Sequence, residues 1–288
     1  MRALKIQQTL NKIENEMHDI APNRNPALFG EFLIRGYSAV TLNSVPEPIF
    51  HEILHAKLCL GTLITLYDDF ADRPDKKNPQ LLESLYQLNF GGRTTTRYLN
   101  PQHHQVISFA ESLFEEMENT LKRLPNYLPF KEILNFDLSQ FYSANQYSSL
   151  LTSHPYLHNS AENCAYAHHN MGMVLAAMMD LTATETIEYS EFGTMREVFL
   201  LGQRMGRIFN VLATHKREVT EGDITGELPP LANAEDLQIA KKKLNQEILD
   251  LYAKIKSFSD RITTFSVESY LEGLLQVEKL HKKMEGTL

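Results

Sequence analysis

The sequence of 288 residues contains no tryptophan, only two cysteines and no excess of basic residues. Its net charge of −8 argues against nucleic acid as the main partner, because binding nucleic acid requires a concentrated basic surface. Cys59 and Cys164 stand alone in apolar helical patterns, so they predict neither a disulfide framework nor a CxxC metal site. No run of about 18 apolar residues and no signal-peptide core is present. We therefore expect a cytoplasmic protein without stable membrane insertion.

Stretches of alternating β-branched residues are nearly absent, so the sequence predicts no β-sheet. Nearly every segment instead repeats its apolar residues with the period of an α-helix. No internal repeat, low-complexity tract or linker divides the chain. We therefore predict one all-α domain of residues 1–288 with about ten helices. The expected helices span residues 2–19, 27–40, 46–69, 80–89, 102–124, 130–151, 160–182, 191–219, 234–258 and 260–285.

A group of three aspartates ends the uncharged, mostly apolar stretch 62–67. Asp68 and Asp72 are spaced i and i+4, which places both on one face of a helix, about one turn apart. Asp69 lies between them. Carboxylates this close repel each other unless a cation lies between them, and their oxygen atoms suit Mg²⁺. A solvated acidic helix end is the simpler interpretation of this group taken alone.

A second group of oxygen ligands follows about 140 residues later, on the helix expected at 191–219. Asn210, Thr214 and Glu218 are spaced i, i+4 and i+8, so one helix face carries all three. Such a set is suited to another hard cation, and the neighbouring Arg217 offers a charged partner for phosphate oxygen. The two groups together indicate two walls of one cavity that could hold a diphosphate.

These residues resemble the class I terpene synthases, in particular the bacterial-type cyclases. Residues 68–72 have the form of the family's DDxxD motif, and residues 210–218 have the form of its second metal motif, Asn-x-x-x-Ser/Thr-x-x-x-Glu. The continuation Val219-Thr-Glu-Gly222-Asp223 is also similar. The resemblance implies a single helical bundle around a central cavity with three Mg²⁺ ions. Asp68 and Asp72 would bind two ions, and Asn210, Thr214 and Glu218 would bind the third. Asp69 is a further possible ligand, although this middle aspartate often contacts other side chains.

The resemblance also implies a reaction. Mg²⁺ would promote loss of diphosphate from a linear prenyl diphosphate, with farnesyl and geranylgeranyl diphosphate as the leading substrates. The carbocation would then cyclise to a hydrocarbon or an alcohol, which makes the enzyme a carbon–oxygen lyase. Homodimers are common in the family. Gly61, Ile64, Thr65 and Gly206 lie one turn above the metal motifs. Aromatic rings stabilise cations, although core packing is the simpler interpretation of any one of the candidate rings taken alone. The candidate rings are Phe141, Tyr142, Phe209, Phe265 and Tyr270.

Two elements of the family pattern are missing. The arginine that senses the diphosphate is expected in a stretch that here reads Tyr166-Ala-His168-His169-Asn170-Met171-Gly172. His168 would take that role as a weaker and pH-dependent anion partner, or else Arg204 or Arg207 would. The C-terminal Arg-Tyr pair is also absent, and only Tyr270 and Lys282-Lys283 stand near its place.

Three other functions stay open at this stage. A chain-elongating or condensing prenyl diphosphate synthase shares the fold, but its usual motifs are both rich in aspartate. His51-Glu52-Ile53-Leu54-His55 matches the HExxH zinc site of metallopeptidases, although no third ligand is evident and Lys57 is atypical. A helical binding protein with an acidic surface would explain the composition and would make the second motif a coincidence.

Overall fold

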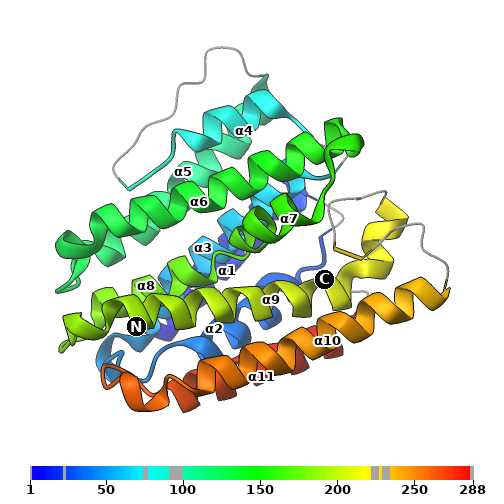
Figure 1. Ribbon diagram of the computed structural model, residues 1–288. Helices are drawn as coiled ribbons and strands as arrows, with labels where there is room; N and C mark the ends of the chain where they lie inside the picture. Colours follow the sequence, from blue (N-terminus) through cyan, green and yellow to red (C-terminus); the bar gives the residue numbers. More distant parts are fainter. Residues whose placement is uncertain are drawn as a thin grey trace.

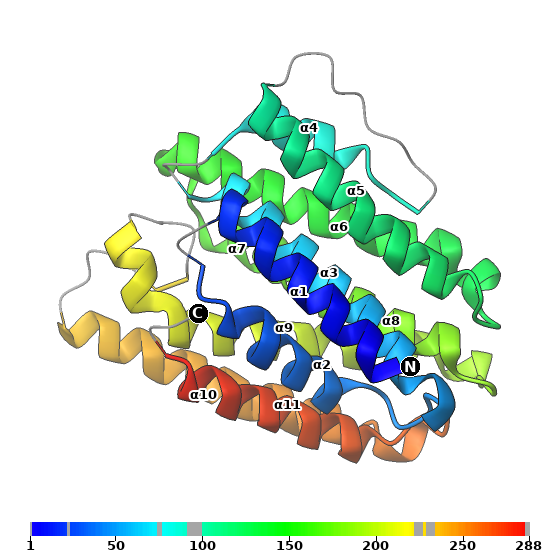
Figure 2. The same ribbon diagram turned by 180° about the vertical axis from the view of Figure 1, so that it is seen from behind.

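The computed structural model describes residues 2–21, 24–73, 77–90, 100–221, 227–228 and 234–285, without the side chains of residues 2–5 and 221. The part of the chain that it describes forms eleven α-helices and no strand, which confirms the predicted all-α class. The helices lie in layers that run along the length of the molecule (Figures 1 and 2).

The helices follow the order predicted from the sequence, with most bounds shifted by a few residues. The first half contains α1 (Arg2–Ile20), α2 (Ile34–Val40), α3 (Phe50–Ala71), α4 (Pro79–Tyr86), α5 (Pro101–Leu121) and α6 (Tyr127–Ser153). The second half contains α7 (Ser160–Tyr166), α8 (Met173–Ala183), α9 (Phe192–Glu221), α10 (Ala234–Lys256) and α11 (Val267–Lys283). A π-helical segment, Leu28–Leu33, leads into α2.

Local sequence explains where several helices begin. The side chain of Asn100 accepts a hydrogen bond from the backbone N–H of His103 at 2.8 Å, and Pro101 takes the first position of α5. Asn78 and Pro79 begin α4 in the same way. An Asn side chain satisfies an N–H group that has no partner within the helix, and proline has no N–H to satisfy there.

The prediction of one helix over residues 160–182 is wrong. A 3₁₀ segment, Ala167–Met171, separates α7 from α8, and Gly172 follows it with a φ of 60°. Only glycine adopts this left-handed conformation at little cost. A Cβ at Gly172 would also lie 2.4 Å from Cδ1 of Ile64 on α3. The last helix likewise begins at Val267 rather than at residue 260.

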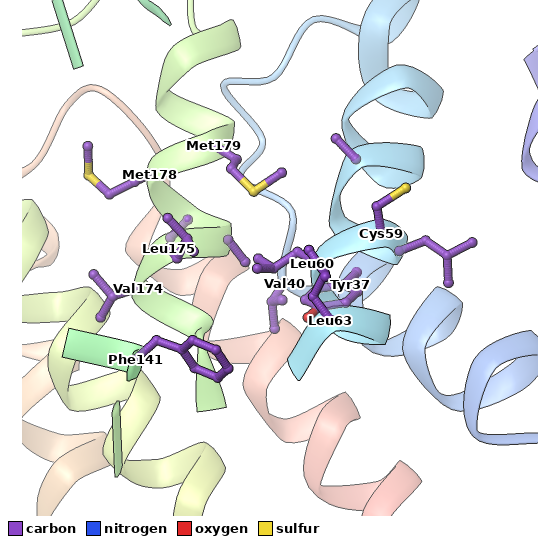
Figure 3. Close-up of a cluster of buried hydrophobic side chains, with 14 of the residues drawn as sticks. Tyr37, Val40, Cys59, Leu60, Leu63, Phe141, Val174, Leu175, Met178 and Met179 are labelled. Atoms are coloured by element: carbon purple, nitrogen blue, oxygen red, sulfur yellow. The ribbon is translucent and has the colours of Figure 1, made fainter. Parts of the chain in front are cut away.

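Helix α3 occupies the middle of the bundle and contacts α1, α2, α4, α5, α6 and α8. Its central residues are buried on nearly all sides, which agrees with the uncharged stretch in the sequence. Figure 3 shows Leu60 and Leu63 of α3 near Tyr37 and Val40 of α2, with apolar residues of α8 on the other side. This packing fixes α3 against the elements that surround the cavity described below.

A buried ion pair ties α3 to α8. Nζ of Lys57 lies 2.6 Å from Oδ2 of Asp180, and both side chains are 0% exposed. The same ammonium donates to the hydroxyl of Thr41, and the backbone N–H of Leu42 donates to Asp180. A buried charge pair has to be hydrogen-bonded to be tolerated, and these contacts supply the bonds. Lys57 therefore fixes the end of α2 against the core.

The segment Glu47–Ala71 is long and apolar enough to cross a membrane, and 72% of its most apolar window is buried inside the fold. It contains α3, whose contacts with six other helices account for its apolar character. Its composition is therefore explained by its central place in the bundle.

Candidate active site

A cavity of about 160 Å³ lies between α3 and α9, with α2, α11 and the 3₁₀ segment around it. The ends of α3 and α9 that carry the two predicted motifs lie at the same end of the bundle, on the right in Figure 1 and on the left in Figure 2. The structure thus brings together two groups of polar residues that are far apart in the sequence.

The last turn of α3 supplies the first acidic wall. Asp68 and Asp72 both line the cavity, and 32% of the Asp68 side chain is exposed. The backbone N–H of Asp72 donates to the carbonyl oxygen of Asp68 at 3.1 Å, which closes the helix at this point. Ile64 and Thr65 continue the same wall one turn earlier. The predicted arrangement of Asp68 and Asp72 on one face is therefore present.

Asp69 takes a different position from its neighbours. Its side chain is 1% exposed and does not line the cavity. Nε and Nη2 of Arg24 donate to its Oδ1 at 3.0 and 2.7 Å, and Nη1 of Arg73 lies 3.8 Å from the same oxygen. The prediction of Asp69 as a metal ligand is corrected, because two guanidinium groups bind this carboxylate behind the wall.

Helix α9 supplies the opposite wall with Asn210, Thr214 and Glu218, all of which line the cavity. The hydroxyl of Thr214 lies 2.8 Å from the carbonyl oxygen of Asn210 and 2.5 Å from Oε1 of Glu218. Both of these oxygens accept, so they share the single hydroxyl proton of Thr214, and the contacts orient the side chains of Thr214 and Glu218. The i, i+4, i+8 spacing thus places all three predicted ligands on one wall of the cavity.

Three arginines lie at the same cavity, namely Arg24, Arg207 and Arg217. Burial alone would lower the pKa of Arg24, but the charges of Asp69, Asp68 and Asp72 together raise it above its ordinary value. Arg207 is buried, and its Nε has no hydrogen-bond partner among the described residues. Guanidinium groups in such places are suited to bind phosphate oxygens. Arg207 and Arg217, the two arginines predicted to contact a diphosphate, thus both line the cavity.

His168 and Arg204 do not lie at this cavity. They line a second hollow beside α6, α9 and α10, and Arg204 is paired there with Glu227 and Glu247. Burial, together with the charges of His169 and Arg204, lowers the pKa of His168 to about 4, so this ring is neutral at pH 7. The prediction of His168 as a diphosphate partner is corrected. Asn170, from the same segment, lines the cavity in its place.

The remaining lining is largely apolar, but it does not contain the predicted rings. Phe32 and Tyr37 are the aromatic residues that the described part of the chain contributes to the lining. The five predicted rings are buried in packing contacts elsewhere: Phe141 and Tyr142 with Tyr67, Phe265 and Tyr270 with Phe199, and Phe209 beside His281. Their interpretation as cavity aromatics is therefore corrected to core packing.

The substitutes considered for the missing C-terminal pair also lie elsewhere. Lys282 is bound to Glu278, and Lys283 is bound to Glu31 at 2.7 Å, both at the surface. Gly222 and Asp223, which continue the second motif in the sequence, fall outside the described residues.

The zinc-peptidase interpretation does not fit the structure. His51 is exposed, and Glu52 is paired with Arg123 at 3.0 Å. His55 points into the core, where its Nε2 lies 2.9 Å from the hydroxyl of Thr9 and 3.3 Å from Glu116. The two histidines therefore do not share an open site. Lys57, which looked atypical for such a helix, belongs to the buried ion pair with Asp180.

The residues around the cavity fit the binding of Mg²⁺. The donor set consists of carboxylate, amide and hydroxyl oxygens, which are the ligands that Mg²⁺ takes in proteins. Three potential metal ligands of the described residues have their ligand atoms within 4.8 Å of one another. They are His55, Cys59 and Glu116, and they lie away from this cavity. The three carboxylates of the cavity, on Asp68, Asp72 and Glu218, therefore do not all lie within that distance of one another. Such spacing suits ions that keep water and phosphate oxygens as their other ligands.

Three residues of this site were missed by reasoning from the sequence: Arg24, Asn170 and His281. All three line the cavity. Asn170 does belong to a segment that the sequence marked, whereas Arg24 and His281 carry no motif. A search for buried polar atoms without partners would have found two of them, because Oδ1 of Asn170 and Nε2 of His281 have no hydrogen-bond partner in the described part of the structure.

The all-helical fold of the described residues matches that of solved terpene synthase structures. Isoprene synthase from grey poplar leaves (Populus x canescens) is similar to this chain, with a TM-score of 0.67 and 12% sequence identity over 100% of this chain and 57% of that one. The same enzyme in complex with three Mg²⁺ ions and dimethylallyl-S-thiolodiphosphate gives a TM-score of 0.64 and 13% identity over 97% of this chain and 54% of that one.

This chain spans a little over half the length of both isoprene synthase structures. No known family model matches its sequence, and no curated protein matches it either. At such low identity the structural similarity establishes the fold alone.

Proposed function

We propose that this protein is an Mg²⁺-dependent class I terpene synthase that releases diphosphate from an allylic prenyl diphosphate. The observation that supports this most strongly is the meeting of Asp68 and Asp72 with Asn210, Thr214 and Glu218 across one cavity. The similar isoprene synthase binds three Mg²⁺ ions and an allylic diphosphate analogue. In this chain Asp68, Asp72, Asn210, Thr214 and Glu218 offer oxygen ligands of the kinds that Mg²⁺ takes in proteins.

The polar and the apolar residues of the cavity would have different roles in this reaction. Arg207 and Arg217 would bind oxygens of the diphosphate, while the carboxylates and Asn210 would hold the metal ions. Bound Mg²⁺ would supply the positive charge that makes diphosphate a good leaving group. Phe32, Leu33, Val40 and Val277 form the apolar side, which would exclude water from the hydrocarbon. The ring of Phe32 can also stabilise a developing cation.

The test is incubation of the purified protein with dimethylallyl, geranyl, farnesyl and geranylgeranyl diphosphate, each with Mg²⁺ or with EDTA. Released diphosphate and extracted products are measured together. We expect Mg²⁺-dependent release of diphosphate and formation of a hydrocarbon or an alcohol from at least one substrate. Elongation of a substrate when isopentenyl diphosphate is added would instead identify a chain-elongating synthase. No turnover of any of the four would contradict the proposal.

Matched variants test whether the activity depends on the residues that α3 and α9 contribute to the cavity. Asp68→Asn and Asn210→Ala should each lower kcat/KM by at least about 100-fold, more than the usual effect of residues that only support a metal ligand. Asp250→Asn and Asn245→Ala make the same chemical changes on exposed positions of α10 and should leave kcat/KM unchanged. Equal activity in all four variants would show that the cavity is not the active site.

A further inference from the structure

His281 is a buried imidazole in the wall of the cavity that the proposed binding of metal and diphosphate does not use. It lies in the last turn of α11, it is 2% exposed, and Val277 precedes it on the same wall by one turn. Its ring meets Phe32 edge to face with the centroids 4.7 Å apart, and the ring of Phe209 lies at 6.2 Å. The imidazole is thus part of the apolar side of the cavity.

The hydrogen bonds determine which nitrogen of His281 carries the proton. Nδ1 lies 2.9 Å from the carbonyl oxygen of Val277, and a carbonyl can only accept, so Nδ1 must be the donor. In the neutral ring Nε2 then holds a lone pair. Burial lowers the pKa of His281 to about 4, although the bond to Val277 and the charge of Glu278 oppose this, so the ring is neutral at pH 7.

The lone pair on Nε2 has no partner in the described part of the structure. A buried acceptor without a hydrogen bond destabilises a folded protein, because the acceptor loses its bonds to water on folding. An apolar residue would avoid that cost in a wall made of Phe32, Gly36 and Val277. A buried basic nitrogen without a partner in the wall of this cavity is therefore better explained by a role in the reaction than by packing.

We propose that Nε2 of His281 accepts the proton that ends the reaction. This inference rests on the proposed function, which generates a carbocation in the cavity. A C–H bond next to the charged carbon breaks, and its electron pair forms the new C=C bond. The proton moves to Nε2 and leaves an imidazolium, whose charge the released diphosphate balances. The proton passes to diphosphate or water when the product leaves.

The other polar residues of the cavity are poorer proton acceptors. Arg24, Arg207 and Arg217 remain protonated, and the amides of Asn170 and Asn210 are too weakly basic. The carboxylates of the two acidic walls would be occupied as metal ligands under the proposed function. Because hydrogens next to a carbocation are strongly acidic, even a weakly basic imidazole can remove one.

The test compares His281→Gln and His281→Phe with the wild type. Both variants remove the base, and the second keeps an aromatic ring against Phe32. His55→Gln is the matched control, because His55 is equally buried but lies outside the cavity. The initial rate of diphosphate release, the ratio of alkene to alcohol products and the thermal unfolding midpoint are measured for each protein, with Mg²⁺ and the substrate that the wild type uses best.

We expect both His281 variants to release diphosphate at a rate within a few-fold of the wild type, while the ratio of alkene to alcohol falls by at least about tenfold. This lower bound stays below the contribution of about 100-fold or more that a general base usually makes. His55→Gln should keep the wild-type ratio. In His281→Ala, added imidazole should enter the vacated space and raise the alkene fraction again, which a purely structural role does not predict.

An unchanged product ratio in His281→Gln and His281→Phe would overturn the inference, as would a wild type that forms only alcohol. These results leave the proposed function intact, because diphosphate release is measured separately. If the wild type releases no diphosphate from any substrate, the proposed function fails and the role of His281 fails with it. Variants that do not fold are recognised by their unfolding midpoints, and imidazole rescue of His281→Ala then decides the question.

Discussion

The neutral imidazole of His281 makes the stability of the protein depend on acid. Its folded-state pKa of about 4 lies below the ordinary value of 6.5, because burial disfavours the charged ring. Between these two values the unfolded chain binds a proton and the folded chain does not, so the free energy of unfolding falls as the pH falls from 6.5 to 4. From pH 7 to pH 4.5 we expect a loss of about 2 kcal/mol from this group.

The contribution of His281 is isolated by comparing urea unfolding of the wild type and of His281→Gln at both pH values. Other groups also titrate in this range, including His168, whose pKa is likewise lowered to about 4, but they are common to both proteins. The wild type should lose about 2 kcal/mol more than the variant on acidification. Parallel losses would show that the imidazole is not held neutral by the fold.

The role of Asp69 could not be predicted from the sequence, because it depends on a contact with a residue that is distant in the sequence. In the sequence Asp69 has the same chemistry as Asp68 and Asp72, and helical spacing alone separates it from them. The decisive contact comes from Arg24, which lies in the loop after α1 and binds Asp69 from 45 positions away. No local pattern predicts that pairing, because it depends on how the loop after α1 folds onto α3.

The prediction that five aromatic residues line the cavity was wrong for a related reason. Burial of Phe141, Tyr142, Phe209, Phe265 and Tyr270 follows from their apolar helical patterns, and the structure confirms that they are buried. Which side of a buried helix faces a cavity rather than a neighbouring helix is decided by packing. Phe32 reaches the cavity through the π-helical segment before α2, a local irregularity that the periodicity does not show.

The crossing of α2 and α11 is the element contact that sets one side of the cavity. Gly273 of α11 lies directly against the backbone of α2, where an added Cβ would be 2.1 Å from the carbonyl oxygen of Ala39. Backbone cannot move aside as a flexible side chain can, so Gly273→Ala must push the two helices apart. We expect it to destabilise the protein by about 1–3 kcal/mol, the usual cost of overpacking.

Gly193 in the first turn of α9 provides the matched control, because a Cβ added there meets nothing within 4 Å. Gly193→Ala should be neutral or stabilising by up to about 1 kcal/mol, since alanine favours a helix over glycine. Both variants are measured by urea unfolding. Similar effects on the free energy of unfolding would contradict the close approach of α2 and α11.

Helix order and most helix bounds follow from sequence periodicity and capping residues, whereas the break at Gly172 does not. The apolar pattern runs through residues 160–182 without a proline to end it, and a lone glycine inside a helical pattern is usually tolerated. The break requires Ile64 of α3 to occupy the space next to Gly172. It also moves Asn170 into the cavity wall while His168 faces the second hollow, which is why the role given to His168 did not hold.

At the scale of the whole molecule, the sequence predicted that the two motifs meet but not how large a space they enclose. Each of the two helices carries oxygen ligands at the end of an apolar stretch, which is why the sequence predicts that the two motifs lie at one cavity. In the structure both groups of ligands line the same cavity. The volume depends on side chains from several elements at once. Met173 of α8, for example, packs against Gly206 of α9 and also lines the cavity.

The cavity volume leads to a prediction about the length of the substrate. At about 160 Å³ it is similar to cavities of about 150 Å³ that hold one benzene molecule. That space suits a hydrocarbon chain shorter than the farnesyl or geranylgeranyl chains that the sequence resemblance suggests. We expect kcat/KM for dimethylallyl or geranyl diphosphate to exceed that for farnesyl diphosphate by at least about tenfold, because each methylene that does not fit already costs about that much.

Shortening Met173 should relax this preference. Met173→Ala removes a side chain from the cavity wall and should raise kcat/KM for farnesyl diphosphate relative to geranyl diphosphate by about tenfold. Met178→Ala makes the same change on the same helix at a buried position outside the lining and should leave that ratio unchanged. Because each ratio is taken within one protein, a loss of stability affects both substrates alike and cancels. A wild type that prefers farnesyl diphosphate would contradict the prediction that the cavity volume limits the length of the substrate.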